Sequence, residues 1–165
     1  MTDRDKLSFE TIRQLKAQGL NQTQIAEHFG VSRQSVSWHW TTYNGPKTPR
    51  QVVMEAWPFE VPRGMGTAWP SRHLRNHGEY IVTGGKGMTE EKLKRLRGFY
   101  KRMRDNNLVI EFDPGIPPED GVSVHGGWAY RQRVPSDGDL LIRVNEHTHL
   151  TEDGKKIWRF PKKEP

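Results

Sequence analysis

Two helix-start signals on either side of a glycine constrain the first third of the chain most tightly. Asn21 is followed three residues later by Gln24, the spacing of a capping box, and Ser32 comes two residues after Gly30. A capping side chain satisfies free amides at a helix start, whereas glycine tolerates the left-handed backbone that ends a helix. The pattern predicts a helix through Phe29, a tight turn and a third helix from Ser32.

An earlier helix completes the unit. Ser8 is its predicted cap, Phe9, Ile12 and Leu15 supply an apolar face, and Gly19 ends it. Three helices with a small residue at Ala26 and the turn glycine four positions later match a helix-turn-helix. A generic three-helix core without DNA contact is the alternative interpretation.

A helical projection sorts the side chains of the third helix. Val36 and Trp40 face inward with His39 at their margin, so polar side chains and Trp38 are left facing outward. Arg pairs with guanine, Gln with adenine and Ser with either bases or phosphates, which suits a major groove. Trp38 could instead pack on the following domain. The predicted major-groove residues are Ser32, Arg33, Gln34, Ser37, Trp38 and Thr41.

The positive charge of the chain lies mostly beyond this unit. The formal net charge is +6, which favours a polyanionic partner. Residues 46–105 hold thirteen Lys and Arg against six Asp and Glu, whereas residues 1–45 hold five against four and residues 106–165 hold eight against ten. A helix-turn-helix with so little charge neutralises few phosphates, so a second DNA-binding module in the same chain is expected.

The breakers Asn44, Gly45, Pro46 and Pro49 place a domain boundary at 45/46, within a linker over 41–50. Beyond it, residues 50–57 are expected to form a short helix, residues 71–83 a helix capped by Ser71, and Thr89 caps a helix through about Asp105. That last helix carries an apolar stripe and seven basic residues between 92 and 104, without an acid. A solvated charged face is the alternative for this basic run.

The predicted contacts to phosphates or from the second module come from the linker, the basic helices and the start of the second motif helix. They are Gln22, Lys47, Arg50, Arg72, His73, Arg75, Asn76, Lys86, Arg95 and Arg102.

The last third reads as a small antiparallel sheet. Strands are expected at 108–112, 127–134, 140–144 and 157–160, with a hairpin around PSDGD at 135–139 and a turn at 152–156. The predicted fold is mainly α with this small C-terminal β-sheet, an α+β protein made of a helix-turn-helix domain (1–45) and a basic α+β domain (46–165).

Three chemical alternatives are weaker. GGKG at 84–87 lacks the strand and the Lys-Ser or Lys-Thr pair of a phosphate-binding loop. His147 and His149 with Glu146 could bind a metal on a strand, but no third ligand has supporting spacing. His73 with His77, and Glu111 with Asp113, could belong to a nuclease, although such groupings are common by chance. We expect no cofactor, metal or catalytic residue.

Residues 77–114 (HGEYIVTGGKGMTEEKLKRLRGFYKRMRDNNLVIEFDP) and 135–161 (PSDGDLLIRVNEHTHLTEDGKKIWRFP), preceded by the helix-turn-helix, resemble the immunity repressors of temperate mycobacteriophages. The resemblance runs along nearly the whole chain. It implies a repressor of an early lytic promoter that maintains lysogeny and also binds many short, asymmetric sites called stoperators. It implies a monomer with two DNA-binding modules.

These features together predict a DNA-binding repressor in the cytoplasm of the bacterial host, since the charged start MTDRDK is no signal peptide and the chain has no cysteine and no long apolar run. A phage endonuclease or recombinase with a helix-turn-helix arm, or a terminase-like packaging adaptor, are the alternatives.

Overall fold

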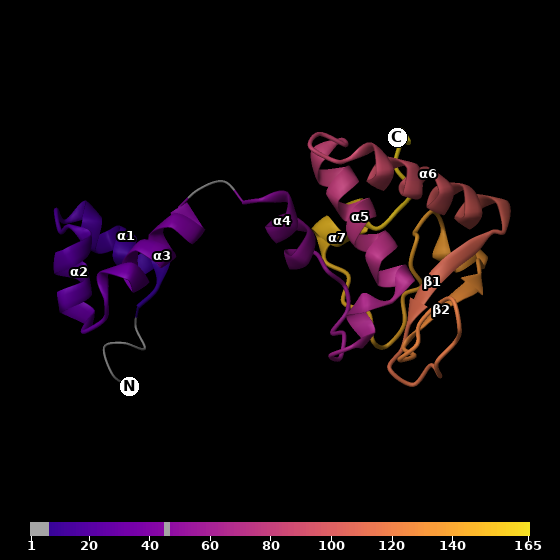
Figure 1. Cartoon of the computed structure of the whole chain (residues 1–165), viewed down its shortest axis with the longest axis horizontal. Helices are drawn as coiled ribbons and strands as arrows, with labels where there is room; N and C mark the ends of the chain where they lie inside the picture. Colours follow the sequence, from indigo (N-terminus) through magenta and orange to yellow (C-terminus); the bar gives the residue numbers. More distant parts are fainter. Residues whose placement is uncertain (1–6, 45–46) are drawn as a thin grey trace. The chain divides into compact units, whose positions relative to one another are not determined.

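The computed structural model describes residues 7–44 and 47–165, which form two compact units, the first ending at Thr48 and the second beginning at Pro49 (Figure 1). The first unit contains helices α1 (Phe9–Ala17), α2 (Gln22–Phe29) and α3 (Arg33–Asn44). Because α3 continues to Asn44, the first residues of the predicted linker are helical. The predicted breakers Gly45 and Pro46 lie outside the described residues.

The capping residues of all three helices were predicted correctly. Ser8 accepts a hydrogen bond from the Thr11 amide, and Asn21 accepts one from the Gln24 amide at 2.8 Å within a complete capping box. Ser32 Oγ accepts one from the Ser35 amide at 3.1 Å. Gly30, with φ of +63°, is the left-handed residue that ends α2. Local capping therefore fixes where each helix begins and how sharply α3 leaves α2.

A small apolar core joins these helices. Its buried members come from all three: Ile12, Ile25, Ala26, Phe29 and Val36. Trp40 packs at its edge as predicted, with its ring 5.5 Å from that of Phe9 and the Lys16 ammonium 4.5 Å from its centre. The remaining face of α3 is consequently left to solvent.

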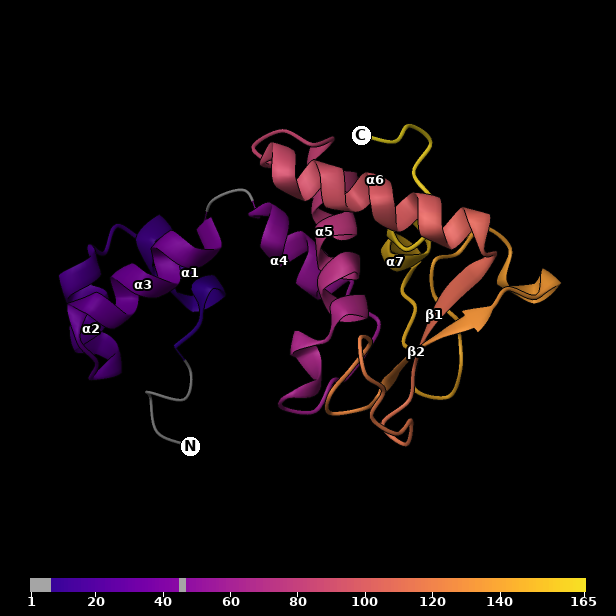
Figure 2. The same ribbon diagram turned by 45° about the vertical axis from the view of Figure 1, so that its right-hand side comes forward.

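The second unit packs its helices beside a two-stranded sheet (Figure 2). Its elements are α4 (Pro49–Glu55), η2 (Met65–Thr67), α5 (Trp69–Thr83), α6 (Glu90–Asp105), β1 (Leu108–Phe112), β2 (Trp128–Gln132), η3 (Pro135–Asp137) and α7 (Glu152–Ile157). Helix α5 contacts α4, α6 and α7, while α6 also contacts β1. The strands are antiparallel, with Leu108 opposite Gln132 and Phe112 opposite Trp128.

Helix α6 has the two faces expected from its sequence. Thr89 caps it by accepting a hydrogen bond from the Lys92 amide. Leu96, Phe99, Tyr100 and Met103 are buried against the core of the unit. The basic residues therefore occupy the rest of its surface.

A buried histidine ties three helices together. His77 of α5 lies 2.6 Å from the Tyr100 hydroxyl of α6 through Nδ1, and 2.6 Å from the Ile157 carbonyl of α7 through Nε2. A neutral imidazole meets both needs, donating from Nε2 and accepting from the hydroxyl at Nδ1. Burial lowers the pKa of His77 to about 4.

Five local predictions were wrong. Ser71 does not cap α5, which begins at Trp69; Ser71 is buried inside its first turn and Pro70 occupies the start. Residues 135–139 do not form a hairpin loop, because β2 pairs with β1 and η3 follows it. Segment 140–144 forms only isolated bridges, including a parallel one between Ile110 and Ile142.

The predicted turn at 152–156 is instead part of helix α7, capped by Thr151. It includes Ile157, so the expected strand 157–160 is reduced to one bridge between Leu140 and Arg159. Here a short helix with a cap and two acids in its first turn replaced the strand that the apolar pattern suggested.

Gly78 and Gly98 form a matched pair for testing the packing of α5. A Cβ on Gly78 would lie 2.8 Å from Val53 Cγ1 and 3.2 Å from the Trp158 ring, whereas one on Gly98 of α6 meets no heavy atom within 4 Å. We expect Gly78→Ala to lower the free energy of unfolding by about 1–3 kcal/mol. Gly98→Ala should raise it by up to about 1 kcal/mol through helix propensity. Urea unfolding measures both, and equal effects would contradict the close approach of α4 to α5.

His77 also predicts a pH dependence of stability. As pH falls, the unfolded chain takes up a proton near 6.5, whereas the folded protein resists until about 4. The contribution of His77 to the free energy of unfolding is therefore complete above pH 6.5. It falls between pH 6.5 and 4, by roughly 3 kcal/mol over the whole window. His77→Gln should be less stable at pH 7.5 but should lose less stability on acidification. His149→Gln, at an exposed histidine, should behave as wild type; urea unfolding across this pH range tests both.

Candidate nucleic-acid interface

The outer face of α3 carries the residues predicted for a major groove. Ser32, Arg33, Gln34, Trp38 and Thr41 are exposed, and Ser37 is half-buried. The hydroxyl of Ser32 is engaged in capping, so its main role in the described structure is to start the helix.

Trp38 is a large apolar side chain displayed on this face. It is 58% exposed, and its ring meets those of His39 and Tyr43 edge-on, at 5.0 and 6.0 Å. His39 is half-buried, and its Nδ1 atom is buried without a hydrogen-bond partner among the described residues. The aromatic neighbours come from α3 itself and help to orient the indole.

Sequence reasoning missed Tyr43, which is 52% exposed and joins Trp38 and His39 in this group. The available signal was its position, five residues after Trp38 on the same helix. Gln22, predicted to contact phosphate, is half-buried at the start of α2, while Lys47 is exposed.

In the second unit, five predicted arginines lie on α4, α5 and α6 and fall into two electrostatic groups. We call them the arginine surface: Arg50, Arg72, Arg75, Arg95 and Arg102. Burial, then Arg72 and Arg50, lower the pKa of the Arg75 guanidinium. Burial, then Arg102 and Arg95, lower the pKa of His73 to about 4. Arg50 and Arg72 are thus close to Arg75, Arg95 and Arg102 are close to His73, and the side chains of all five arginines are exposed.

Aromatic rings connect the two halves of the arginine surface. The His73 ring stacks on Phe99 at 4.8 Å and on Trp69 at 5.9 Å, and the Arg72 guanidinium lies 5.3 Å from the Trp69 ring. Arg102 similarly lies 4.2 Å from the Tyr130 ring of β2. His73 is half-buried and neutral at pH 7, so it positions neighbours rather than adding positive charge.

The arginines of helix α6 lie on two lines along the helix, and the two lines have different neighbours. Arg95 and Arg102 are seven residues apart and therefore on one line, next to His73. Arg97 and Arg104 form a second line that contacts the end of the chain: Arg97 donates to the Pro165 carbonyl at 2.9 Å, and Arg104 pairs with Glu164. Only the first line belongs to the arginine surface.

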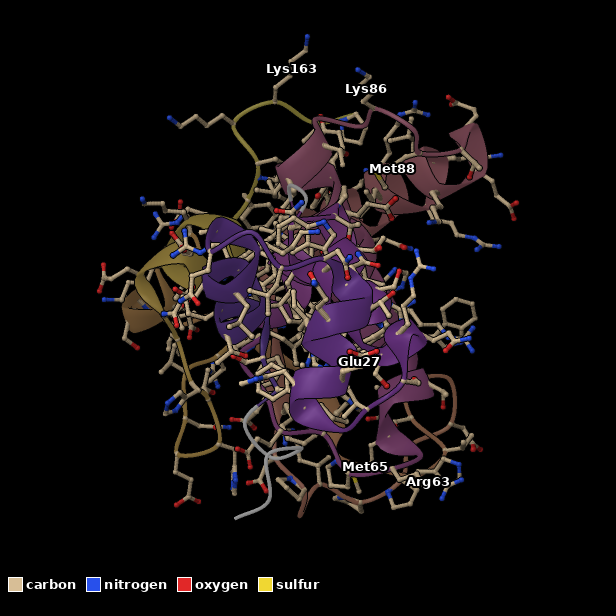
Figure 3. The ribbon with its side chains drawn as sticks, turned by 90° about the vertical axis from the view of Figure 1, so that its left-hand side faces the viewer. Glu27, Arg63, Met65, Lys86, Met88 and Lys163 are labelled. Carbon is tan, nitrogen blue, oxygen red and sulfur yellow. The ribbon has the colours of Figure 1, made fainter. Side chains whose placement is uncertain are left out.

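Two other predicted residues lie elsewhere or deeper. Lys86 follows the C-terminal end of α5, roughly 20 Å along the helix from Trp69. Figure 3 shows it extending at the opposite end of the unit from Arg63 and Met65. Asn76 is half-buried on α5. Arg75 donates to the Gly66 carbonyl at 2.6 Å, so part of its guanidinium is already used.

For the metal-site alternative, the structure groups His147 and Glu146 with Asp113 rather than with His149. Residues 146–147 form a turn rather than a strand, and His147 lies 3.4 Å from Asp113 and 3.5 Å from Glu146. These three have ligand atoms within 4.8 Å of one another and could hold a cation; His149 is not among them. The nuclease alternative grouped His73 with His77 and Glu111 with Asp113. In the structure both ring nitrogens of His77 are engaged in the core, and Glu111 pairs with Arg131.

Within residues 7–44 and 47–165, no helix has the length and apolarity needed to cross a membrane. No family model matches the sequence. The chain is 46% identical over 156 residues to the repressor-like immunity protein of Mycobacterium phage L5, a match that covers 94% of this chain and 85% of that relative. Identity of this extent, running through both units, shows that the chain belongs to the mycobacteriophage immunity repressors.

Proposed function

We propose that this protein is a sequence-specific DNA-binding repressor that maintains phage lysogeny and immunity to superinfection. In this proposal α3 reads bases in a major groove, and the arginine surface of the second unit binds the phosphates of adjacent DNA. The protein acts in the host cytoplasm without a cofactor. The observation that carries the proposal is that the polar face of α3 and the arginine surface are both exposed, one in each unit.

The geometry of the first unit supports a helix-turn-helix. The left-handed Gly30 between α2 and α3 gives the tight turn of that motif, and the buried Ala26 permits close packing. The second helix of such a motif presents its N-terminal residues to base edges. Arg33 and Gln34 occupy those positions on α3 and are exposed.

Charge supports a contribution from the second unit. Neutralising phosphates supplies much of the affinity for DNA, and residues 1–45 carry only one more basic than acidic residue. Many helix-turn-helix proteins compensate by forming dimers on two half-sites. The arginine surface offers the same compensation within one chain. We therefore propose that a monomer binds short asymmetric operator and stoperator sites.

Selection of binding sites from random DNA, followed by footprinting and sizing of the complex, tests this proposal. One chain on one non-palindromic site is the expected result. A palindromic site bound by two chains would contradict the monomer, and failure to select any sequence would contradict the function. Incubation with plasmid and Mg²⁺ or Mn²⁺ tests the enzymatic alternative, since a repressor leaves DNA intact. A ring on sizing would favour a packaging adaptor.

Replacing the outward residues of α3 should alter base preference. Gln34→Ala or Trp38→Ala is expected to relax discrimination by ~1–3 kcal/mol at base pairs at one end of the site, because the lost contact reads a base edge. Competition binding with each single-base variant of the selected site measures this. Gln14→Ala, at an exposed glutamine of α1, is the matched control and should keep the wild-type preference. Equal weakening on selected and random DNA would contradict base reading.

Removing charge from the arginine surface should weaken binding to every sequence. Arg95→Ala with Arg102→Ala is expected to reduce the slope of log affinity against log salt by about one to two, because fewer phosphate counterions are released. Lys155→Ala with Lys156→Ala removes the same charge from α7 and should leave the slope nearly unchanged. Equal slopes for the two double variants would contradict phosphate binding by α6 and favour the alternative that its basic residues form a solvated charged face.

A further inference from the structure

A groove adjoins the arginine surface at the start of α5. It has a volume of about 170 Å³ and lies between η2, the first turn of α5 and residues 121–125. Trp69 and Arg72 line one side, while Val122, Val124 and His125 line the other. Arg72 belongs to both the groove and the arginine surface, so DNA bound to that surface would lie beside the groove.

The turn that forms one wall is held firmly. Glu119 and Ser123 exchange two backbone hydrogen bonds of 2.9 Å, and Ser123 Oγ donates to the Gly126 carbonyl at 2.7 Å while fully buried. The Trp69 amide donates to the Val122 carbonyl at 3.3 Å, which links this turn directly to α5. Because these bonds already fix the turn, binding of a ligand to it costs little further conformational entropy.

Val124 stands out on this wall because it is 71% exposed, and Trp69 opposite is 46% exposed. A single exposed valine is ordinary on a protein surface. Here it is presented on a rigid turn across the groove from Arg72, a member of the arginine surface, for which a polyanion is the complementary partner. In the major groove of DNA the apolar feature is the C5 methyl group of thymine.

We propose that Val124 contacts the methyl group of one thymine in the DNA that the arginine surface binds, so that the second unit also reads sequence. This inference rests on the proposed function. The side chains of Arg50, Arg72 and Arg75 contact the phosphates of the DNA. The turn that carries Val124 enters the major groove of the DNA between those phosphates. Glu119 and Asp120 precede Val124 in this turn; their carboxylates favour a position facing cytosine amino groups over one along the phosphates.

The experiment combines a protein variant with a DNA analogue that lacks only this methyl group. Each thymine of a site selected by the wild-type protein is replaced in turn by uracil, and affinities are measured for wild type, Val124→Ala and Val144→Ala. Val144 is an exposed valine of the same unit outside the groove. Replacing one particular thymine should weaken wild type about threefold to fivefold, the effect of one buried methyl.

With Val124→Ala, sensitivity to that thymine should disappear, while its response to the other thymines stays as in wild type. Val144→Ala should match wild type throughout. The inference is overturned if Val124→Ala keeps the wild-type uracil profile, or weakens selected and random DNA equally. It is also overturned if the substitution changes the oligomeric mass, which would make the groove a contact between copies. If wild type selects no sequence, the proposed function itself fails; if it selects one without this coupling, only the reading by Val124 fails.

Discussion

The bonds of His77 to Tyr100 and to the Ile157 carbonyl underlie the arrangement of the second unit. They join α5 to α6 and α7 through one imidazole, and burial keeps that imidazole neutral by lowering its pKa to about 4. Gly78, next along α5, lets α4 approach through Val53. The arginines on α4, α5 and α6 are consequently held near one another by a core that contains none of them.

Clustering like charges costs free energy, and the aromatic rings beside the arginines help to offset it. Arg72 lies over Trp69 and Arg102 over Tyr130, contacts in which the face of the ring attracts the guanidinium. His73, between these positions, remains neutral because burial and the neighbouring arginines lower its pKa to about 4. The arginine surface can therefore attract an anionic partner through its arginines, while the neutral His73 at its centre adds no further positive charge.

Local signals in the sequence were sufficient for the helices of the first unit and for α6. Caps such as Asn21 and Thr89 act within a few residues, and Leu96 and Met103 repeat at helical spacing. The sequence was insufficient where pairing is long-range. The bridge of Ile110 with Ile142 depends on chain folding, not on the apolar run at 140–144, so a hairpin was predicted instead. Lys86 was likewise grouped with Arg72 among the predicted DNA contacts, although the length of α5 separates them.

The ion pairs of α6 change how its charge should be counted. Five of its seven cations, Lys92, Arg95, Arg97, Lys101 and Arg104, already have a carboxylate within 4 Å. A cation that leaves Glu91 for a phosphate exchanges one anion for another, and exposed pairs of this kind are weak enough to break. The formal charge of the helix is therefore an upper bound on its effective valence toward a nucleic acid.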